Sequence, residues 1–128
     1  MNLTFNEFLA EARKPFRPNY RSWIVHPGFN GLYLRYGQRH IEKVTYRGVL
    51  DIATVEVEPD QRGKGIFKGF IEFLRWYHPE LHLYVENAHP QLGEGLLRMG
   101  FTRVDDTSIH EIASNYFMLA KPKTSSKG

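Results

Sequence analysis

The segment that most constrains this chain lies at residues 55–70, which read VEVEPDQRGKGIFKGF. Alternating apolar residues before Pro59 predict the end of a strand, and the apolar spacing after Gly65 predicts a helix. The loop between them is basic and contains Gly63 and Gly65. Such a turn directs backbone N–H groups and the positive end of the helix at one point, a geometry that suits a pyrophosphate. We therefore expect a phosphate-binding strand–loop–helix unit here.

The rest of the chain predicts one α/β domain around this unit. With 128 residues, the chain is long enough for a single hydrophobic core. Helices are expected at residues 5–12, 65–77 and 90–99, and strands at residues 22–25, 31–36, 39–46, 49–57, 81–86, 101–104 and 115–121, with turns at 26–28 and 47–48. This order predicts a mixed sheet with helices on both faces, in a domain over residues 1–122 with a frayed tail at 123–128. The strand–helix–strand unit at 49–86 is expected to be a right-handed parallel crossover.

The composition excludes several classes of chemistry. The chain contains no cysteine, which excludes disulfides, thiol catalysis and Cys-ligated metals. Its histidines lack the spacing of a zinc site, so we expect no metal. No apolar run approaches the roughly 18 residues of a membrane span, and no signal peptide opens the chain. We therefore expect a cytoplasmic protein with no membrane contact, and the net charge of +3 favours an anionic ligand.

Two common phosphate-binding motifs do not fit the loop. The chain has no GxxxxGK(S/T) P-loop, and residues 63–68 read GKGIFK rather than GxGxxG. Residues 55–70 instead resemble motif A of the GNAT superfamily of N-acetyltransferases, whose loop reads Q/R-x-x-G-x-G/A after a strand that ends in V-x-P. Arg62, Gly65 and Phe67 occupy the first, fourth and sixth positions of that loop. Phe67 departs from the small residue that is usual at the sixth position.

A second segment extends the resemblance. Residues 81–101, LHLYVENAHPQLGEGLLRMGF, resemble motif B of the same superfamily, with Asn87 at the asparagine that faces the cofactor and a Gly-Phe pair at the end. The resemblance implies the GNAT fold, a mixed, mostly antiparallel sheet that is splayed open between two central parallel strands. In this sequence those strands are residues 49–57 and 81–86.

The resemblance implies an enzyme that moves an acetyl group from acetyl-CoA directly to a primary amine in a ternary complex. The pantetheine arm would lie between the splayed strands and bond to the backbone at Val55 and Val57. The Val55 N–H would polarise the thioester carbonyl. The cofactor-binding residues implied by the two motifs are Val55, Val57, Arg62, Gly63, Lys64, Gly65, Ile66, Phe67 and Asn87.

The first candidate for the general base is Asp51, which stands where a catalytic Glu stands in the histone-acetylating branch of the family. Alternation places Asp51 and Val55 on one face of their strand. Burial between apolar neighbours would raise the pKa of the Asp51 carboxyl. An alternative is that Asp51 only flanks the hairpin turn expected at 47–48. Glu56 is the second candidate for the base.

The general acid has no residue at the position that the family predicts. Relatives often carry a tyrosine on the helix of motif B, and Leu96 stands at that position here. Tyr116, His89 or water would then protonate the departing thiolate, or the thiolate would leave unassisted. The expected catalytic residues are therefore Asp51, Glu56 and Tyr116.

No motif defines the acceptor, and both a protein lysine and a small amine fit the sequence. In the family the acceptor is chosen by regions that correspond here to residues 15–48 and 105–115. The second region contains Asp105, Asp106 and Glu111, which would attract a cationic amine. The oligomeric state is not set by the sequence, although small relatives often dimerise.

Two other functions remain open from the sequence. Leu96 and Phe67 favour a catalytically inactive module that binds CoA or a protein on the same fold. The basic residues at 13–21 and 39–47, with aromatic residues among them, would suit a nucleic-acid-binding protein.

The first residues carry a second, shorter resemblance. The opening MNLTFNEFLAEA is similar to the capsid-targeting peptides of internal head proteins in T4-like bacteriophages. This likeness implies cleavage after Glu11 and a protein that is packaged in a virion and acts in the host cytoplasm. The alternative is that residues 1–14 form a helix that covers the sheet, with Thr4 as its N-cap.

Overall fold

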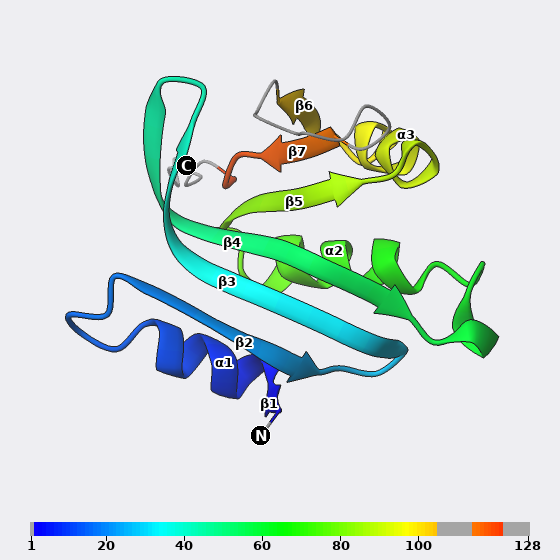
Figure 1. Ribbon diagram of the computed structural model, residues 1–128, viewed down its shortest axis with the longest axis horizontal. Coiled ribbons are helices and arrows are strands. Elements are labelled where there is room, and N and C mark those ends of the chain that lie inside the picture. Colours follow the sequence, from blue (N-terminus) through cyan, green and yellow to red (C-terminus); the bar gives the residue numbers. More distant parts are fainter. Residues whose placement is uncertain (1, 105–113, 122–128) are drawn as a thin grey trace, which may run out of the picture.

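The computed structural model describes residues 2–104 and 114–121 of the chain, and their strands form a single mixed sheet (Figure 1). The strand order is β1-β2-β3-β4-β5-β7-β6. The elements are β1 (Leu3–Thr4), α1 (Phe5–Ala12), β2 (Asn19–Val25), β3 (Phe29–Ile41), β4 (Val44–Val57), the 3₁₀ helix η1 (Pro59–Gln61), α2 (Ile66–Tyr77), β5 (His82–Ala88), α3 (Pro90–Arg98), β6 (Thr102–Val104) and β7 (Ser114–Met118). The pairs β1–β2 and β4–β5 are parallel and the others are antiparallel. The α/β class and the mixed sheet are therefore confirmed.

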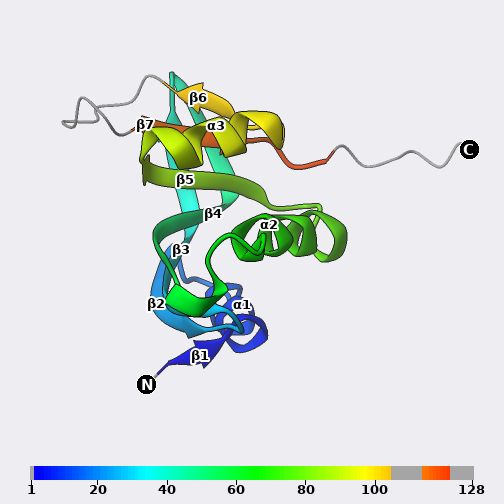
Figure 2. The same ribbon diagram turned by 90° about the vertical axis from the view of Figure 1, so that its right-hand side faces the viewer.

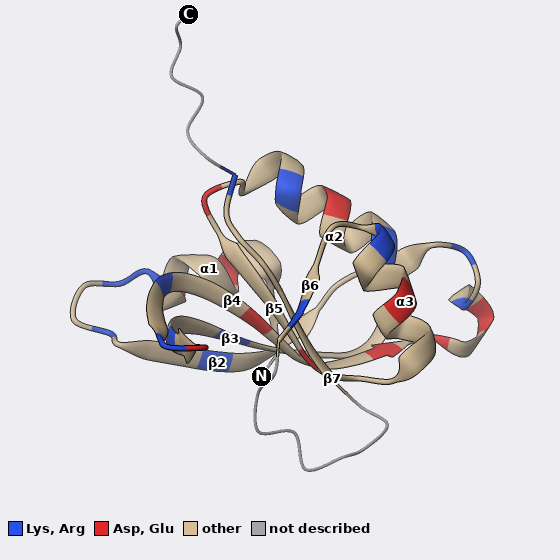
Figure 3. Cartoon of the chain, turned by 90° about the horizontal axis from the view of Figure 1, so that it is seen from above, with Lys and Arg blue, Asp and Glu red and all other residues tan. Residues whose placement is uncertain are grey.

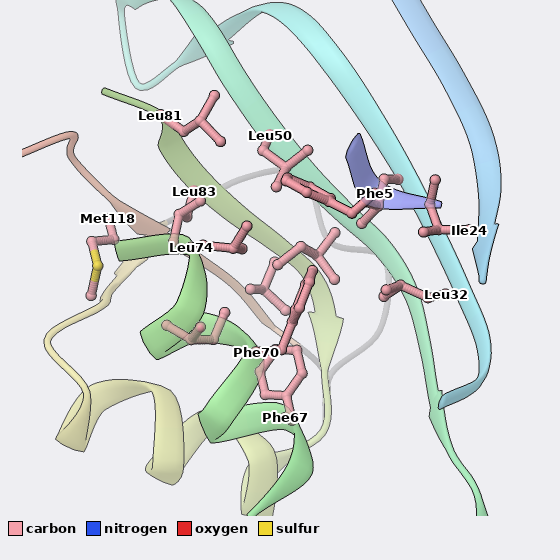
Figure 4. Close-up of a cluster of buried hydrophobic side chains, with 14 of the residues drawn as sticks. Phe5, Ile24, Leu32, Leu50, Phe67, Phe70, Leu74, Leu81, Leu83 and Met118 are labelled. Atoms are coloured by element: carbon pink, nitrogen blue, oxygen red, sulfur yellow. The ribbon is translucent and has the colours of Figure 1, made fainter. Parts of the chain in front are cut away.

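All three α-helices of the described residues pack on one face of the sheet. Phe8 of α1, Phe70 of α2 and Leu96 of α3 belong to one core cluster with the strand residues Leu50 and Leu83. Figures 2 and 3 show α1 and α2 on the same side of the strands, and Figure 4 shows Phe70 pointing into the cluster that contains Leu50 and Leu83. The opposite face carries a smaller cluster of strand residues: Ile41, Val49, Tyr84, Val104 and Phe117.

The expectation of helices on both faces was therefore wrong. The connections β4–α2–β5 and β5–α3–β6 both step toward the β6 edge of the sheet. Right-handed crossovers that step in the same direction place their helices on the same face. The sequence gives the order of the elements along the chain but not the order of the strands in the sheet, on which this result depends.

The long hairpin of β3 and β4 turns at Glu42 and Lys43, not at residues 47–48 as expected. Both turn residues have positive φ, 45° and 75°, as a tight two-residue hairpin turn requires. Gly48 lies inside β4, opposite a register irregularity between Gly37 and Arg39. The turn was predicted at the wrong place because glycine occurs at β-bulges as well as at turns, and because Glu-Lys is an unusual pair for a two-residue turn.

A second irregularity lies within β4 and changes which of its residues share a face. Tyr33 pairs with Thr54 whereas Leu34 pairs with Ile52, which leaves Ala53 as the extra residue of a β-bulge. Val55 therefore packs against the same core cluster as Ile52. Asp51 faces the other side, so the expected common face of Asp51 and Val55 was wrong.

The N-terminal residues form part of the core. A capping box begins α1: the Glu7 N–H donates to Thr4 Oγ1 at 3.2 Å, and the Thr4 N–H donates to Glu7 Oε1 at 2.9 Å. Phe5, Phe8 and Leu9 are buried against the sheet. Loss of residues 1–11 would remove all three side chains, and removal of one buried Phe or Leu costs about 2–5 kcal/mol. The capsid-targeting function stays a prediction, but cleavage after Glu11 would open this core.

Candidate functional site

The sheet opens between its fourth and fifth strands. The parallel register of β4 and β5 runs from Val49 opposite His82 to Ile52 opposite Val85 and ends there. Both strands continue, β4 to Val57 and β5 to Ala88, and they diverge in Figure 1. A cavity of about 650 Å³ opens where the pairing ends, and we call it the interstrand cavity.

Several of the predicted cofactor residues meet at this cavity. Val55 and Val57 line it from β4, Arg62 from the loop, Phe67 from α2 and Asn87 from β5. The predicted residues of the loop itself, Gly63, Lys64, Gly65 and Ile66, continue the chain between Arg62 and Phe67. The structure thus brings the two sequence motifs to opposite walls of one cavity.

The glycines of the loop are required by the backbone. Gly63 and Gly65 have φ of 78° and 75°, in the left-handed region that other residues rarely adopt. Gly65 is the N-cap of α2, and no side chain caps the helix there. The N–H groups of the first turn therefore remain available to an anionic ligand. Arg62 Nε donates to the Val57 carbonyl at 3.2 Å, which ties the loop to the end of β4.

Phe67 and Asn87 shape the two walls of the cavity. The Phe67 side chain belongs to the core cluster and also lines the cavity. Asn87 has a left-handed φ of 50°, and its backbone N–H donates to Asn115 Oδ1 at 2.9 Å. The buried Asn115 therefore holds the irregular end of β5. Asn115 belongs to no motif in the sequence, although a polar residue at the start of a buried strand was a usable signal.

A cluster of four charged residues lies beside the point where the strands part. Arg39 Nη1 donates to Asp51 Oδ2 at 2.8 Å, and Arg35 Nη1 donates to Glu86 Oε2 at 2.6 Å. The crossed contacts are longer, 3.6 Å from Arg35 to Asp51 and 3.5 Å from Arg39 to Glu86. The Arg39 guanidinium lies over the Tyr84 ring at 3.9 Å from its centroid. Sequence reasoning missed Arg35, Arg39 and Glu86, because only the strand register brings them to Asp51.

Asp51 is the most buried member of this cluster, with 3% of its surface exposed. Its Oδ1 atom is buried and has no hydrogen-bond partner among the described residues. Burial raises the pKa of Asp51 to about 8; the Glu86 carboxyl adds to the rise, whereas Arg39 and Arg35 oppose it. The alternative that Asp51 flanks a hairpin turn was wrong, because the turn lies at Glu42 and Lys43.

The raised pKa predicts how stability depends on pH. The folded state binds the Asp51 proton more tightly than the unfolded chain, so this contribution is present below about pH 4 and is lost as the pH rises to about 8. Asp51→Asn lacks this titration. We expect the unfolding free energy of the wild type, measured in urea, to fall relative to that of Asp51→Asn between these pH values. A difference that does not change with pH would contradict the assignment.

The other predicted catalytic residues lie in different places. Glu56 is exposed and lines the interstrand cavity. Tyr116 is buried and is not among the described residues that line this cavity. His89 does line it, and its Nδ1 accepts the Leu92 N–H at 3.2 Å as the cap of α3. The proton of a neutral His89 ring is therefore on Nε2, from which His89 can donate a hydrogen bond into the cavity.

Tyr116 instead packs beneath α3 against Gly93. A Cβ on Gly93 would lie 2.8 Å from the Tyr116 Cζ atom, whereas a Cβ on Gly95 would meet nothing closer than 3.9 Å. We expect Gly93→Ala to lower the free energy of unfolding by about 1–3 kcal/mol through overpacking. Gly95→Ala, the matched control in the same helix, is expected to be neutral or stabilising by up to about 1 kcal/mol. Equal denaturation midpoints for the two variants would contradict this packing.

The part of the chain that the structure describes shows neither a metal-ligand cluster nor a helix suited to span a membrane. No group of three His, Asp or Glu side chains there is placed to hold a metal ion. No helix in the same residues is both long and apolar enough to cross a membrane. The predicted acidic loop residues Asp105, Asp106 and Glu111 lie outside the described residues.

Comparison with family models, curated proteins and solved structures found no match to this chain.

Proposed function

We propose that this protein is an N-acetyltransferase of the GNAT type, which transfers an acetyl group from acetyl-CoA to a primary amine. The observation that carries the proposal is the interstrand cavity, which opens where β4 and β5 stop pairing and has the glycine loop at its edge. The GNAT resemblance implies a splayed sheet at the same two strands. Geometry and resemblance therefore favour the same ligand.

The cavity suits the two ends of acetyl-CoA for different reasons. The pyrophosphate would bind the N–H groups before and within the first turn of α2, with Arg62 adding a positive charge. Beyond Ile52, the edge of β4 that faces β5 has no paired strand. An extended pantetheine arm would hydrogen-bond to that edge as an added strand does. The Val55 N–H would then donate to the thioester oxygen as charge develops on it.

The chemistry needs one base and one proton donor. Asp51 would accept the proton of the ammonium group, after which the amine attacks the thioester carbonyl and forms the new C–N bond. Collapse of the tetrahedral intermediate breaks the C–S bond and releases the CoA thiolate. His89 or water would protonate this thiolate. Because Asp51 faces away from the helices, the acceptor would approach from the open face, which fits direct transfer in a ternary complex.

The two alternative functions have less support. The inactive CoA-binding module has one observation in its favour: Leu96, which stands at the position of the missing tyrosine, is fully buried in the core. Nucleic-acid binding has less support because basic residues of the segment 13–21 already have acidic partners. Arg13 pairs with Glu80, and Lys14 and Arg17 pair with Glu11. Figure 3 shows blue and red segments interspersed over the described chain rather than one continuous basic surface. A cytoplasmic location and a bacteriophage origin stay predictions.

The binding half of the proposal is tested by calorimetric titration with acetyl-CoA, with CoA and ADP as controls. Micromolar binding of both CoA forms supports it. Arg62→Gln is expected to weaken CoA binding by about tenfold to a hundredfold, the loss of one charge-assisted contact. Arg103→Gln, an exposed change on β6 away from the cavity, is the matched control. No binding of acetyl-CoA at millimolar concentration would reject the acetyltransferase function.

A further inference from the structure

A second cavity of about 500 Å³ lies over β2, β3 and β4, with Asp51 in its wall. Arg21 of β2 and Arg35 and Arg39 of β3 also line it, and we call it the arginine pocket. Asp51 contacts Arg39, which contacts Glu86, and Glu86 lines the interstrand cavity. The charged cluster therefore lies between the two cavities and contributes residues to both.

The strand register builds a row of charges across the floor of the arginine pocket. Arg21 lies directly opposite Arg35, and Arg35 lies directly opposite Asp51. Arg35 shares the carboxyl groups of Asp51 and Glu86 with Arg39, so its charge is only partly neutralised, and Arg21 has no ion pair among the described residues. Two like charges opposite each other on neighbouring strands destabilise a sheet. An anion bound beside Arg21 and Arg35 would remove this repulsion.

The net charge of the arginine pocket also favours an anionic ligand. Three guanidinium groups line it, and Asp51 is the only carboxyl among the described residues of its wall. Burial raises the pKa of that carboxyl to about 8, so at neutral pH it is largely uncharged. In the ionised form of Asp51, the buried Oδ1 is an acceptor that has no donor among the described residues, and an ammonium group would supply one. The pocket thus combines an excess of positive charge with one orphan acceptor.

We infer that the arginine pocket is the acceptor site and that the acceptor is a small amine bearing a carboxylate, such as an amino acid. The carboxylate would bind between Arg21 and Arg35, and the amine would meet Asp51 at the junction with the interstrand cavity. This inference rests on the proposed acetyltransferase function. The volume lies in the range of about 300–1,000 Å³ that small-molecule sites occupy. A protein lysine would bring no carboxylate of its own to the arginines.

The test compares amino acids with the amines that lack only the carboxylate: lysine with cadaverine, phenylalanine with phenethylamine, and glycine with methylamine. Each is titrated calorimetrically into the protein saturated with CoA, and separately offered as acceptor with acetyl-CoA while thiol release is measured. We expect at least one amino acid to bind and react at least tenfold better than its partner amine. Arg21→Gln is expected to remove about tenfold or more of that preference. Arg47→Gln, exposed on β4 outside the pocket, is expected to keep it.

The outcomes separate this inference from the function on which it rests. Thiol release with cadaverine or another simple amine, and no preference for any carboxylate, would overturn the acceptor class but leave the acetyltransferase intact. A carboxylate preference that Arg21→Gln leaves unchanged would overturn the assignment to this pocket. Absence of acetyl-CoA binding would reject both, even if an amino acid binds. Preference lost in Arg21→Gln and retained in Arg47→Gln would support the inference.

Discussion

Replacement of Asp51 with asparagine is expected to lower the turnover of acetyl-CoA by about 10²–10⁴-fold, the usual contribution of a general base. Asparagine keeps the shape and the contact with Arg39 but cannot accept a proton. Affinity for CoA, measured by calorimetry, is expected to change little, because Asp51 is not among the residues that line the interstrand cavity. In the wild type, kcat/KM is expected to rise with pH toward about 8, as the raised pKa of Asp51 requires.

Asp60→Asn in η1, an exposed acidic residue, is the control for this result. It is expected to leave both turnover and the pH profile unchanged. Glu56→Gln tests the second candidate for the base and is expected to have a smaller effect than Asp51→Asn, since Glu56 is exposed and Asp51 is buried. Wild-type turnover in Asp51→Asn, or loss of the pH dependence in Glu56→Gln alone, would contradict the assignment.

Replacement of Phe70 with alanine is expected to have the largest effect on stability, about 3–5 kcal/mol of the free energy of unfolding. The Phe70 ring is 2% exposed and contacts the rings of Phe5, His26 and Phe29, with centroids 6.1, 5.0 and 5.5 Å away. It therefore joins α1, α2 and the start of β3. A small domain has a total stability of only about 5–15 kcal/mol, so much of the fold would be at risk.

The matched control is Trp76→Ala in the same helix. Trp76 is 77% exposed, so its removal is expected to change the unfolding free energy by no more than about 0.5 kcal/mol. Urea denaturation of both variants measures the difference. An average substitution costs about 1 kcal/mol. A loss smaller than this in Phe70→Ala would show that the aromatic cluster is not packed as described.

Local patterns predicted the elements that carry the cavity. The strand–loop–helix segment, the capped N-terminal helix and the helix that begins at Pro90 all lie close to their expected bounds. These features depend on neighbouring residues, such as the Thr4–Glu7 capping box or a glycine with positive φ before a helix. Sequence patterns over a few neighbouring residues are therefore sufficient to predict such local features.

Features that depend on strand pairing were predicted poorly. The β-bulge at Ala53 cannot be read from alternation, and it separates Asp51 from Val55. The partners of Asp51 come from other strands, Arg35 and Arg39 from β3 and Glu86 from β5. The position of Tyr116 also depends on strand pairing: its ring packs beneath α3 beside Gly93 and is not among the described residues that line the interstrand cavity. The raised pKa of Asp51 was expected from burial, but the groups that modulate it were not.

The most direct test of the central claim is a product assay with purified protein, acetyl-CoA and the paired acceptors described above. Release of free CoA thiol is followed with time, and the acceptor is examined by mass spectrometry in the same sample. The account predicts one acetylated amine for each thiol released, at a rate that rises with pH and that Asp51→Asn lowers. Thiol release without an acetylated product, or no release although acetyl-CoA binds, would contradict the account and favour an inactive CoA-binding module.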